Sequence, residues 1–337
     1  MSAPTENHPA RDVPHELPPV EPPSARFIIQ LFVIPAAIVL VLVVAYVLLI
    51  QLPFGRLANG GRDVMDYVRS IKSDNEHRRW RSAQELANLI QNDTRLAKDA
   101  TLLGELTALL DQELGRPKLD KPELAQFLAL SLGSFQTTKA NPVDGHVVDP
   151  VLTLARALGP EQPTVVRVGA AISLSRLADR AGGSLSEPEA VRALIEASAT
   201  GDAEVRQRAS YALGYFSGDD ALNALRNRIS EDEDRASRYN AAAALARKGD
   251  VESLQAVKEM LSPADLAQTL KGATTSETES AIEAVMLEAL WGLQVSAPTR
   301  PALAVKLRPQ IEALAKSAPK TVSIEAQNLL KKLPDAP

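Results

Sequence analysis

The stretch from 202 to 229 reads DAEVRQRASYALGYFSGDDALNALRNRI, and the stretch from 235 to 261 follows the same pattern as RASRYNAAAALARKGDVESLQAVKEML. Shifting the first stretch by 32 residues aligns like residues at Arg206 and Arg238, Ala209 and Ala241, Ala212 and Ala244, and Leu213 and Leu245. Each stretch contains two segments with apolar residues at helical spacing, joined by a Gly-Asp turn. Such a pair of short helices cannot bury its apolar stripe alone, so the repeat predicts a stack of helix pairs around one continuous core.

The repeat continues towards the N-terminus in weaker copies, with VVRVGAAISLSRLA at 165–178, LAQFLALSLGSF at 124–135 and RRWRSAQELANL at 78–89. Strand signals are absent, because aromatic residues make up only 4% of the chain and no long alternating run occurs. The predicted fold class is therefore all-α. We expect helix pairs at 75–115, 120–158, 163–200, 202–231, 234–261 and 278–317, followed by a closing helix at 321–333. Residues 262–278 break the period and predict an extra short helix and a mobile loop.

These units resemble HEAT repeats, in the short form known from bilin-lyase-like proteins, whose motif V-R-x-x-A-x-x-A-L-G is followed by G-D and a second helix. The resemblance implies a right-handed α-solenoid, an armadillo-type superhelix, over 75–333. It also implies that the motif arginines, here Arg167, Arg206 and Arg238, reach an acidic residue or a carbonyl of a neighbouring repeat. Some relatives attach or isomerise a bilin, which makes such an enzyme a remote alternative. With no cysteine and few aromatic residues, this chain offers little to hold a bilin.

A run of 24 residues from Phe27 to Ile50 contains no charged side chain and is long enough for a helix to cross a bilayer. It predicts one transmembrane helix ahead of the solenoid. Lys and Arg are more frequent after the run than before it, so the solenoid is expected in the cytoplasm, on a single-pass protein of the bacterial inner (cytoplasmic) membrane. The predicted parts are a disordered proline-rich tail at 1–26, the membrane helix at 27–50, a juxtamembrane linker with a short helix at 51–74, the solenoid at 75–333 and a disordered end at 334–337.

No constellation of residues predicts chemistry. The four histidines lack a second ligand at metal-binding spacing, and no nucleophile or phosphate-loop motif occurs, so no catalytic, cofactor or metal residue is expected. The net charge of −5 argues against a nucleic-acid partner, and no small-molecule substrate is expected. The acidic run Glu231-Asp232-Glu233-Asp234 lacks the spacing of a calcium loop and is interpreted as a solvated turn.

The predicted function is a membrane-anchored, non-catalytic scaffold or adaptor that binds protein partners and contacts the bilayer through 27–50. The alternative is an accessory subunit of a transporter or secretion complex that assembles through its span. We expect the second helix of each pair on the concave side, with its outward positions as the docking surface. In the two clearest units these positions are Asn223, Arg226, Asn227, Gln255, Lys258 and Glu259.

Overall fold

Helices provide almost all the regular structure of the described part of the chain. In this computed structural model that part comprises residues 63–73, 75–116, 122–182, 185, 187–270 and 274–334, all within the unit Asp63–Pro337. It contains no β-strand, and one isolated bridge joins Val143 to His146. The all-α prediction is therefore confirmed for these residues. The α-helices are α4 (Val64–Ile71), α5 (Glu76–Asn92), α6 (Ala100–Leu114), α7 (Pro122–Leu132), α8 (Pro150–Ala157), α9 (Thr164–Arg180), α10 (Pro188–Ala199), α11 (Ala203–Leu213), α12 (Asp219–Glu231), α13 (Arg235–Arg247), α14 (Leu254–Met260), α15 (Pro263–Thr269), α16 (Thr275–Ser296), α17 (Ala302–Lys306), α18 (Arg308–Ser317) and α19 (Lys320–Leu330), with short 3-10 turns η2 (Leu96–Lys98) and η3 (Val251–Ser253).

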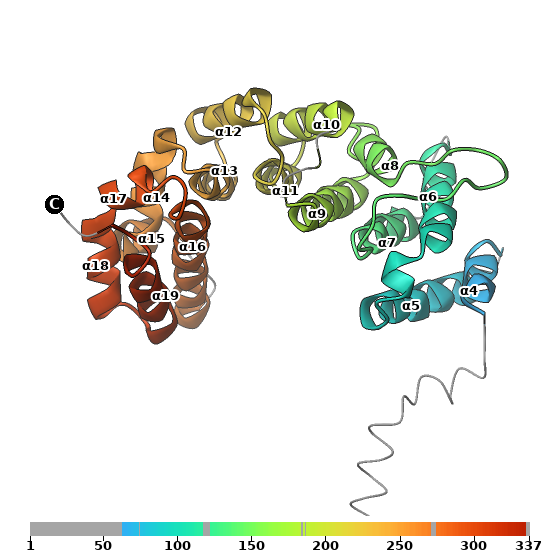
Figure 1. The fold of residues 1–337 in the computed structure, drawn as a ribbon, viewed down its shortest axis with the longest axis horizontal. Helices are drawn as coiled ribbons and strands as arrows, with labels where there is room; N and C mark the ends of the chain where they lie inside the picture. The colour runs from blue at the N-terminus through green and yellow to red at the C-terminus, as the bar shows by residue number, and fades with distance from the viewer. Residues whose placement is uncertain are drawn as a thin grey trace, which may run out of the picture. The chain divides into compact units, whose positions relative to one another are not determined.

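Between α5 and α13, alternate helices of the chain form two layers (Figure 1). In the first layer, neighbours pack in the order α5, α7, α9, α11, α13, α16 and α19. In the second layer they pack in the order α6, α8, α10 and α12. Figure 1 shows the second layer on the outer side of the row between α8 and α13, and the first layer on its inner side. Each helix therefore buries one face against the other layer and two flanks against its neighbours.

The observed hairpins pair each helix with a different neighbour than the sequence predicted, shifted by one helix along the chain. Helix α10 packs along α11 and α12 packs along α13, whereas α9 and α10, paired in the sequence prediction, do not pack along each other. Connection length explains the difference, because three residues join α10 to α11 and α12 to α13, but seven separate α9 from α10. The helices expected on the concave side, α10 and α12, consequently lie in the outer layer, and that expectation is wrong.

The buried apolar side chains form two clusters that meet at α13. The first, here called the N-terminal core, contains residues of α4 to α12, and the second, the C-terminal core, contains residues of α14 to α19. Helix α13 contributes to both. Ala170, Ala209 and Ala241 are fully buried, because helices of adjacent repeats approach closely at these positions.

A long connection between α7 and α8 is fastened to α6. The backbone N–H of Gln136 donates to the carbonyl of Ala97 at 2.7 Å, and that of Asn141 donates to the carbonyl of Ala100 at 2.9 Å. The approach is so close that a Cβ on Gly104 would lie 2.4 Å from the Asn141 carbonyl oxygen. Glycine at 104 is therefore required for the connection to dock.

The segment that breaks the repeat period does contain the predicted extra helix, α15. The following helix, α16, begins with a capping box in which the Thr274 hydroxyl accepts from the Glu277 N–H at 3.1 Å and the Glu277 carboxylate accepts from the Thr274 N–H at 2.9 Å. The mobile loop was predicted within the same segment: residues 271–273 lie outside the described residues, whereas 275–278 form the first turn of α16.

Among the described residues, no helix combines the length and apolarity needed to cross a bilayer. The longest, α16, carries four glutamates. On this finding the prediction of a single-pass protein of the bacterial inner membrane, with its solenoid in the cytoplasm, is wrong. The apolar run at 27–50 on which that prediction was based lies outside the described residues.

Candidate binding surface

The three motif arginines make structural contacts. Arg206 donates from Nε and Nη2 to the Asp232 carboxylate at 3.0–3.2 Å. Arg238 donates from Nη1 to the Asp232 carbonyl at 2.7 Å, and Arg167 donates from Nε to the Leu158 carbonyl at 3.0 Å. Arg206 thus reaches an acidic residue of the next packed hairpin, as the HEAT resemblance implied. The carbonyls that Arg167 and Arg238 reach lie in the connections just before their own helices, so the three side chains do not form a free basic row.

Two carboxylates of the acidic run are part of the architecture, so the interpretation as a solvated turn is wrong for them. The Asp232 side chain is only 1% exposed, because Arg206 holds it between α11 and α13. Asp234 caps α13 by accepting from the Ser237 N–H at 2.7 Å, and it accepts from Gln207 Nε2 at 3.0 Å. Burial alone would raise the pKa of Asp234, but these hydrogen bonds and the charge of Arg206 outweigh burial and lower it. Among the described residues, no group of three or more acidic or histidine side chains could hold a metal ion.

The six residues predicted for docking occupy α12 and α14. Asn223, Asn227, Gln255 and Lys258 are exposed, as predicted. Three of the six, Asn223, Arg226 and Glu259, bond to other side chains of the protein. Arg226 pairs with Asp250 at 2.6 Å and also donates to Asn223 Oδ1 at 3.3 Å. Glu259 accepts from the Tyr239 hydroxyl at 2.7 Å, and burial together with this bond raises the pKa of Tyr239 to about 12.

Sequence reasoning missed a set of exposed apolar side chains on the first layer. They are Trp80 on α5, 47% exposed, Trp291 and Val295 on α16, 49% and 62% exposed, and Ile324 on α19, 45% exposed. Trp80 meets Phe127 of α7 edge to face, with 5.9 Å between ring centroids. The spacing of apolar residues in the sequence did not mark them, and the exposure of both tryptophans follows from how their helices pack. Exposed tryptophans are typical anchors of protein interfaces.

A polar cluster on the same layer joins three consecutive helices. The Arg247 guanidinium of α13 lies 4.6 Å from the ring centroid of Tyr211 and 4.6 Å from that of Tyr215. Its Nη1 donates to Glu288 of α16 at 3.0 Å, and its Nη2 donates to the Tyr211 carbonyl at 3.2 Å. The two tyrosine hydroxyls are 2.8 Å apart. Since Arg247 and Glu288 neutralise each other, this part of the surface carries aromatic rings with little free charge.

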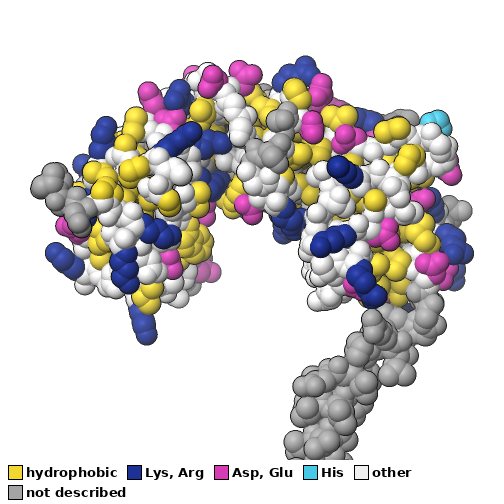
Figure 2. All heavy atoms as spheres, in the orientation of Figure 1, with side chains coloured by type: hydrophobic (Ala, Val, Ile, Leu, Met, Phe, Trp, Pro, Cys, Tyr) yellow, Lys and Arg dark blue, Asp and Glu magenta, His cyan; other side chains and the backbone are white. Residues whose placement is uncertain are grey.

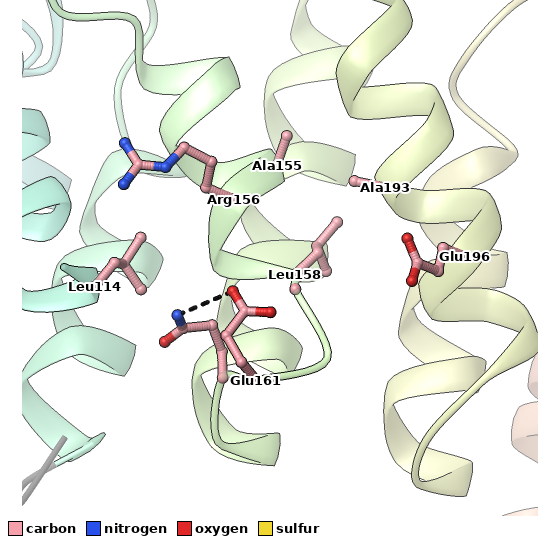
Figure 3. A pocket seen from close by; sticks show the side chains of 9 residues that line it. Leu114, Ala155, Arg156, Leu158, Glu161, Ala193 and Glu196 are labelled. Carbon is pink, nitrogen blue, oxygen red and sulfur yellow. Dashed lines mark hydrogen bonds between the residues drawn. The ribbon is translucent and has the colours of Figure 1, made fainter. Parts of the chain in front are cut away.

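A cavity of about 230 Å³ opens on the second layer between α6, α8 and α10. Leu114, Leu158 and Ala193 supply apolar walls, and Glu161 and Glu196 supply carboxylates. Figure 3 shows the Arg156 guanidinium turned away from both glutamates, and it pairs instead with Asp111. A second cavity, of about 200 Å³, lies between α4, α5, α6 and α7, where Glu113 already binds two arginines of its rim. Neither cavity brings together a nucleophile and a base.

Charges of both signs are interspersed over the face of the molecule in Figure 2, with hydrophobic atoms between them. The face in view therefore has no single-sign field of the kind that attracts a polyanion or a polycation.

The hairpin packing and the buried motif residues agree with a comparison of sequences. Residues 191–276 match the family model for HEAT repeats. The matched range runs from α10 into α16 and includes both of the strongly similar stretches. The resemblance is thus confirmed over this range. No curated protein matches the chain.

Solved structures with similar folds include natural and designed repeat proteins. The complex of CpcE and CpcF of phycocyanin lyase from Nostoc sp. is similar with a TM-score of 0.45 and 18% identity, over 81% of this chain and 95% of that chain. Computationally designed armadillo repeat proteins for modular peptide recognition give a TM-score of 0.38 and 15% identity, over 81% of this chain and 100% of that chain. A designed armadillo repeat protein in complex with the peptide (KR)4 gives 0.40 and 15%, with the same coverage.

Proposed function

We propose that the chain is a non-catalytic scaffold that binds protein partners through the exposed side of its first layer. The observation that supports this is the set of four exposed large apolar side chains on α5, α16 and α19, two of them tryptophans. Leaving a large apolar side chain such as Trp or Ile in water is unfavourable, and covering it with a partner lowers the free energy of the system. The two cavities contain no catalytic constellation, which also favours a binding role.

The first layer suits this role because its helices pack side by side in one row. In this proposal a partner that lies along the row contacts Trp80 and Phe127 on α5 and α7, and Trp291 and Ile324 on α16 and α19. Repeat stacks bind in this way by distributing contacts over successive units. The six polar residues, on α12 of the outer layer and on α14, remain a proposed second docking surface.

The experiment compares two variants of the full chain in crosslinking and affinity capture from the native cells. One variant carries Trp80→Ala and Trp291→Ala, and the other carries alanine at Asn223, Arg226, Asn227, Gln255, Lys258 and Glu259. Truncating a central interface tryptophan typically costs about 2 kcal/mol or more, which corresponds to roughly a thirtyfold loss of affinity. We expect the tryptophan variant to lose its captured partners and the outer-layer variant to keep them.

The opposite pattern would place docking on the outer layer, at the residues predicted from sequence. If both variants recover the same proteins as the unmodified chain, neither surface is the docking site and the proposal fails. Circular dichroism of each variant verifies that the helical fold is intact.

A further inference from the structure

Helix α13 is the joint between the two cores, and the residues that it presents to both are mostly alanines. Ala241, Ala244 and Leu245 belong to the N-terminal core, whereas Ala242, Ala243 and Ala246 belong to the C-terminal core. On one side, a Cβ added to Gly214 would lie 2.8 Å from the Cβ of Ala244. On the other, a Cβ added to Gly292 would lie 3.0 Å from the Ala243 carbonyl oxygen.

In contacts of this kind the helices are close together, but their side chains interdigitate little. Large side chains that interdigitate fix the rotation of one helix against another, whereas alanine and glycine form shallow ridges and grooves. Packed helices slide past each other in shear motions when little interlocks between them. The small residues of α13 hold its neighbours near, but they define the angle between the two cores only weakly.

Arg247 supplies what the alanines lack. Its side chain projects from the last turn of α13 and contacts one helix of each core at once. Towards the N-terminal core it lies between Tyr211 and Tyr215 and donates to the Tyr211 carbonyl. Towards the C-terminal core it pairs with Glu288. The Arg247 side chain is 9% exposed, so these contacts are largely screened from water and have a fixed geometry.

We propose that Arg247 is a clamp that fixes the angle between the N-terminal and C-terminal cores at α13. The clamp lies on the same layer as the exposed apolar side chains, so it sets how far apart Trp80 and Trp291 are held. The planar guanidinium is essential to this role, because it stacks on two rings while it donates to an acceptor on either side.

The chain contains no cysteine, which allows spin labels to be placed without background. Ala199→Cys on α10 and Ala313→Cys on α18 are both at exposed positions and report the distance across the joint. The matched control pair, Gln91→Cys on α5 with Ala199→Cys, reports a distance within the N-terminal core. Distances are measured by pulsed electron paramagnetic resonance on the full chain without a partner, so the result does not depend on the docking proposal.

In the Arg247→Met variant we expect the distance across the joint to broaden and its mean to shift by roughly 2 Å or more, the scale of helix shear. The control distance should stay unchanged. Glu288→Gln removes only the charge that holds α16 and should give a smaller change of the same kind, which keeps the test available if Arg247→Met folds poorly. Distributions across the joint that match the unmodified chain in a folded variant of either kind would overturn the proposal.

Discussion

Removing the Asp232 carboxylate should loosen the contact between α11 and α13 more than any surface substitution nearby. In the Asp232→Ala variant, Arg206 Nε and Nη2 and the N–H of Asp234 lose their acceptor. Breaking a buried ion pair from one side typically costs about 3–5 kcal/mol. Here the Arg206 side chain keeps 20% of its surface in water and can be partly rehydrated, so we expect about 2–4 kcal/mol.

The assay is hydrogen exchange followed by mass spectrometry, because a repeat stack need not unfold in one step and exchange reports local free energy. A loss of about 2–4 kcal/mol accelerates exchange of the α11 and α13 amides by roughly 30- to 700-fold. The control is Glu233→Ala, which removes the adjacent exposed carboxylate. If Asp232→Ala exchanges at the rate of this control, the ion pair does not fasten the repeats and the reasoning fails.

Three further outcomes are expected. Ala241→Leu adds volume at a fully buried position and should lower stability by about 1–3 kcal/mol, seen as a lower melting temperature. Asp234→Asn should be less stable than the unmodified chain at neutral pH, because folding lowers the pKa of Asp234. The ionised carboxylate stabilises the fold above its unfolded pKa, near pH 4, and this stabilisation is lost as the pH falls through its folded pKa. The denaturation midpoints of the variant and the unmodified chain should therefore converge in acid. Gly104→Ala forces the Asn141 carbonyl away, and limited proteolysis should cut the connection at 133–149 faster.

Each of these outcomes has a matched comparison. Ala199→Leu adds the same volume at an exposed position of α10, and an equal loss of stability in both variants would contradict the packing argument. A gap between Asp234→Asn and the unmodified chain that persists at low pH would show that the charge of Asp234 is not what stabilises α13. Gly115→Ala places its Cβ 3.5 Å from the nearest oxygen and should leave proteolysis unchanged.

Sequence periodicity was sufficient to predict where the helices lie in the chain, but not which helices pack against each other. The five predicted pairs from 75 to 261 correspond to observed helices within a few residues, because the apolar spacing and the Gly-Asp turns mark where helices begin and end. The pair predicted at 278–317 is instead three helices, α16, α17 and α18. Which helices pack together depends on connection length, and the three residues between α12 and α13 were available in the sequence as that signal. The outer-layer position of Asn223 follows from the same misassigned pairing.

The charged residues show a different limit. The resemblance to HEAT repeats implied that Arg206 would find an acidic partner, but which of four adjacent carboxylates it would bury is decided by the geometry of the turn before α13. The exposure of Trp291 is likewise a matter of tertiary packing, since helical spacing alone does not distinguish an apolar residue at the edge of a stripe from one outside it.

The ion pairs Arg206 with Asp232 and Arg226 with Asp250 each join one helix pair to the next, and the helices that pack together are near one another in the chain. Each helix pair of such a row contacts only its neighbours, so no contact among the described helices links the two ends directly, as contacts in a globular core would. Under tension applied at its ends, the described unit should therefore extend by releasing one helix pair after another. We expect it to lengthen in steps as the force rises and to shorten again when the force is removed.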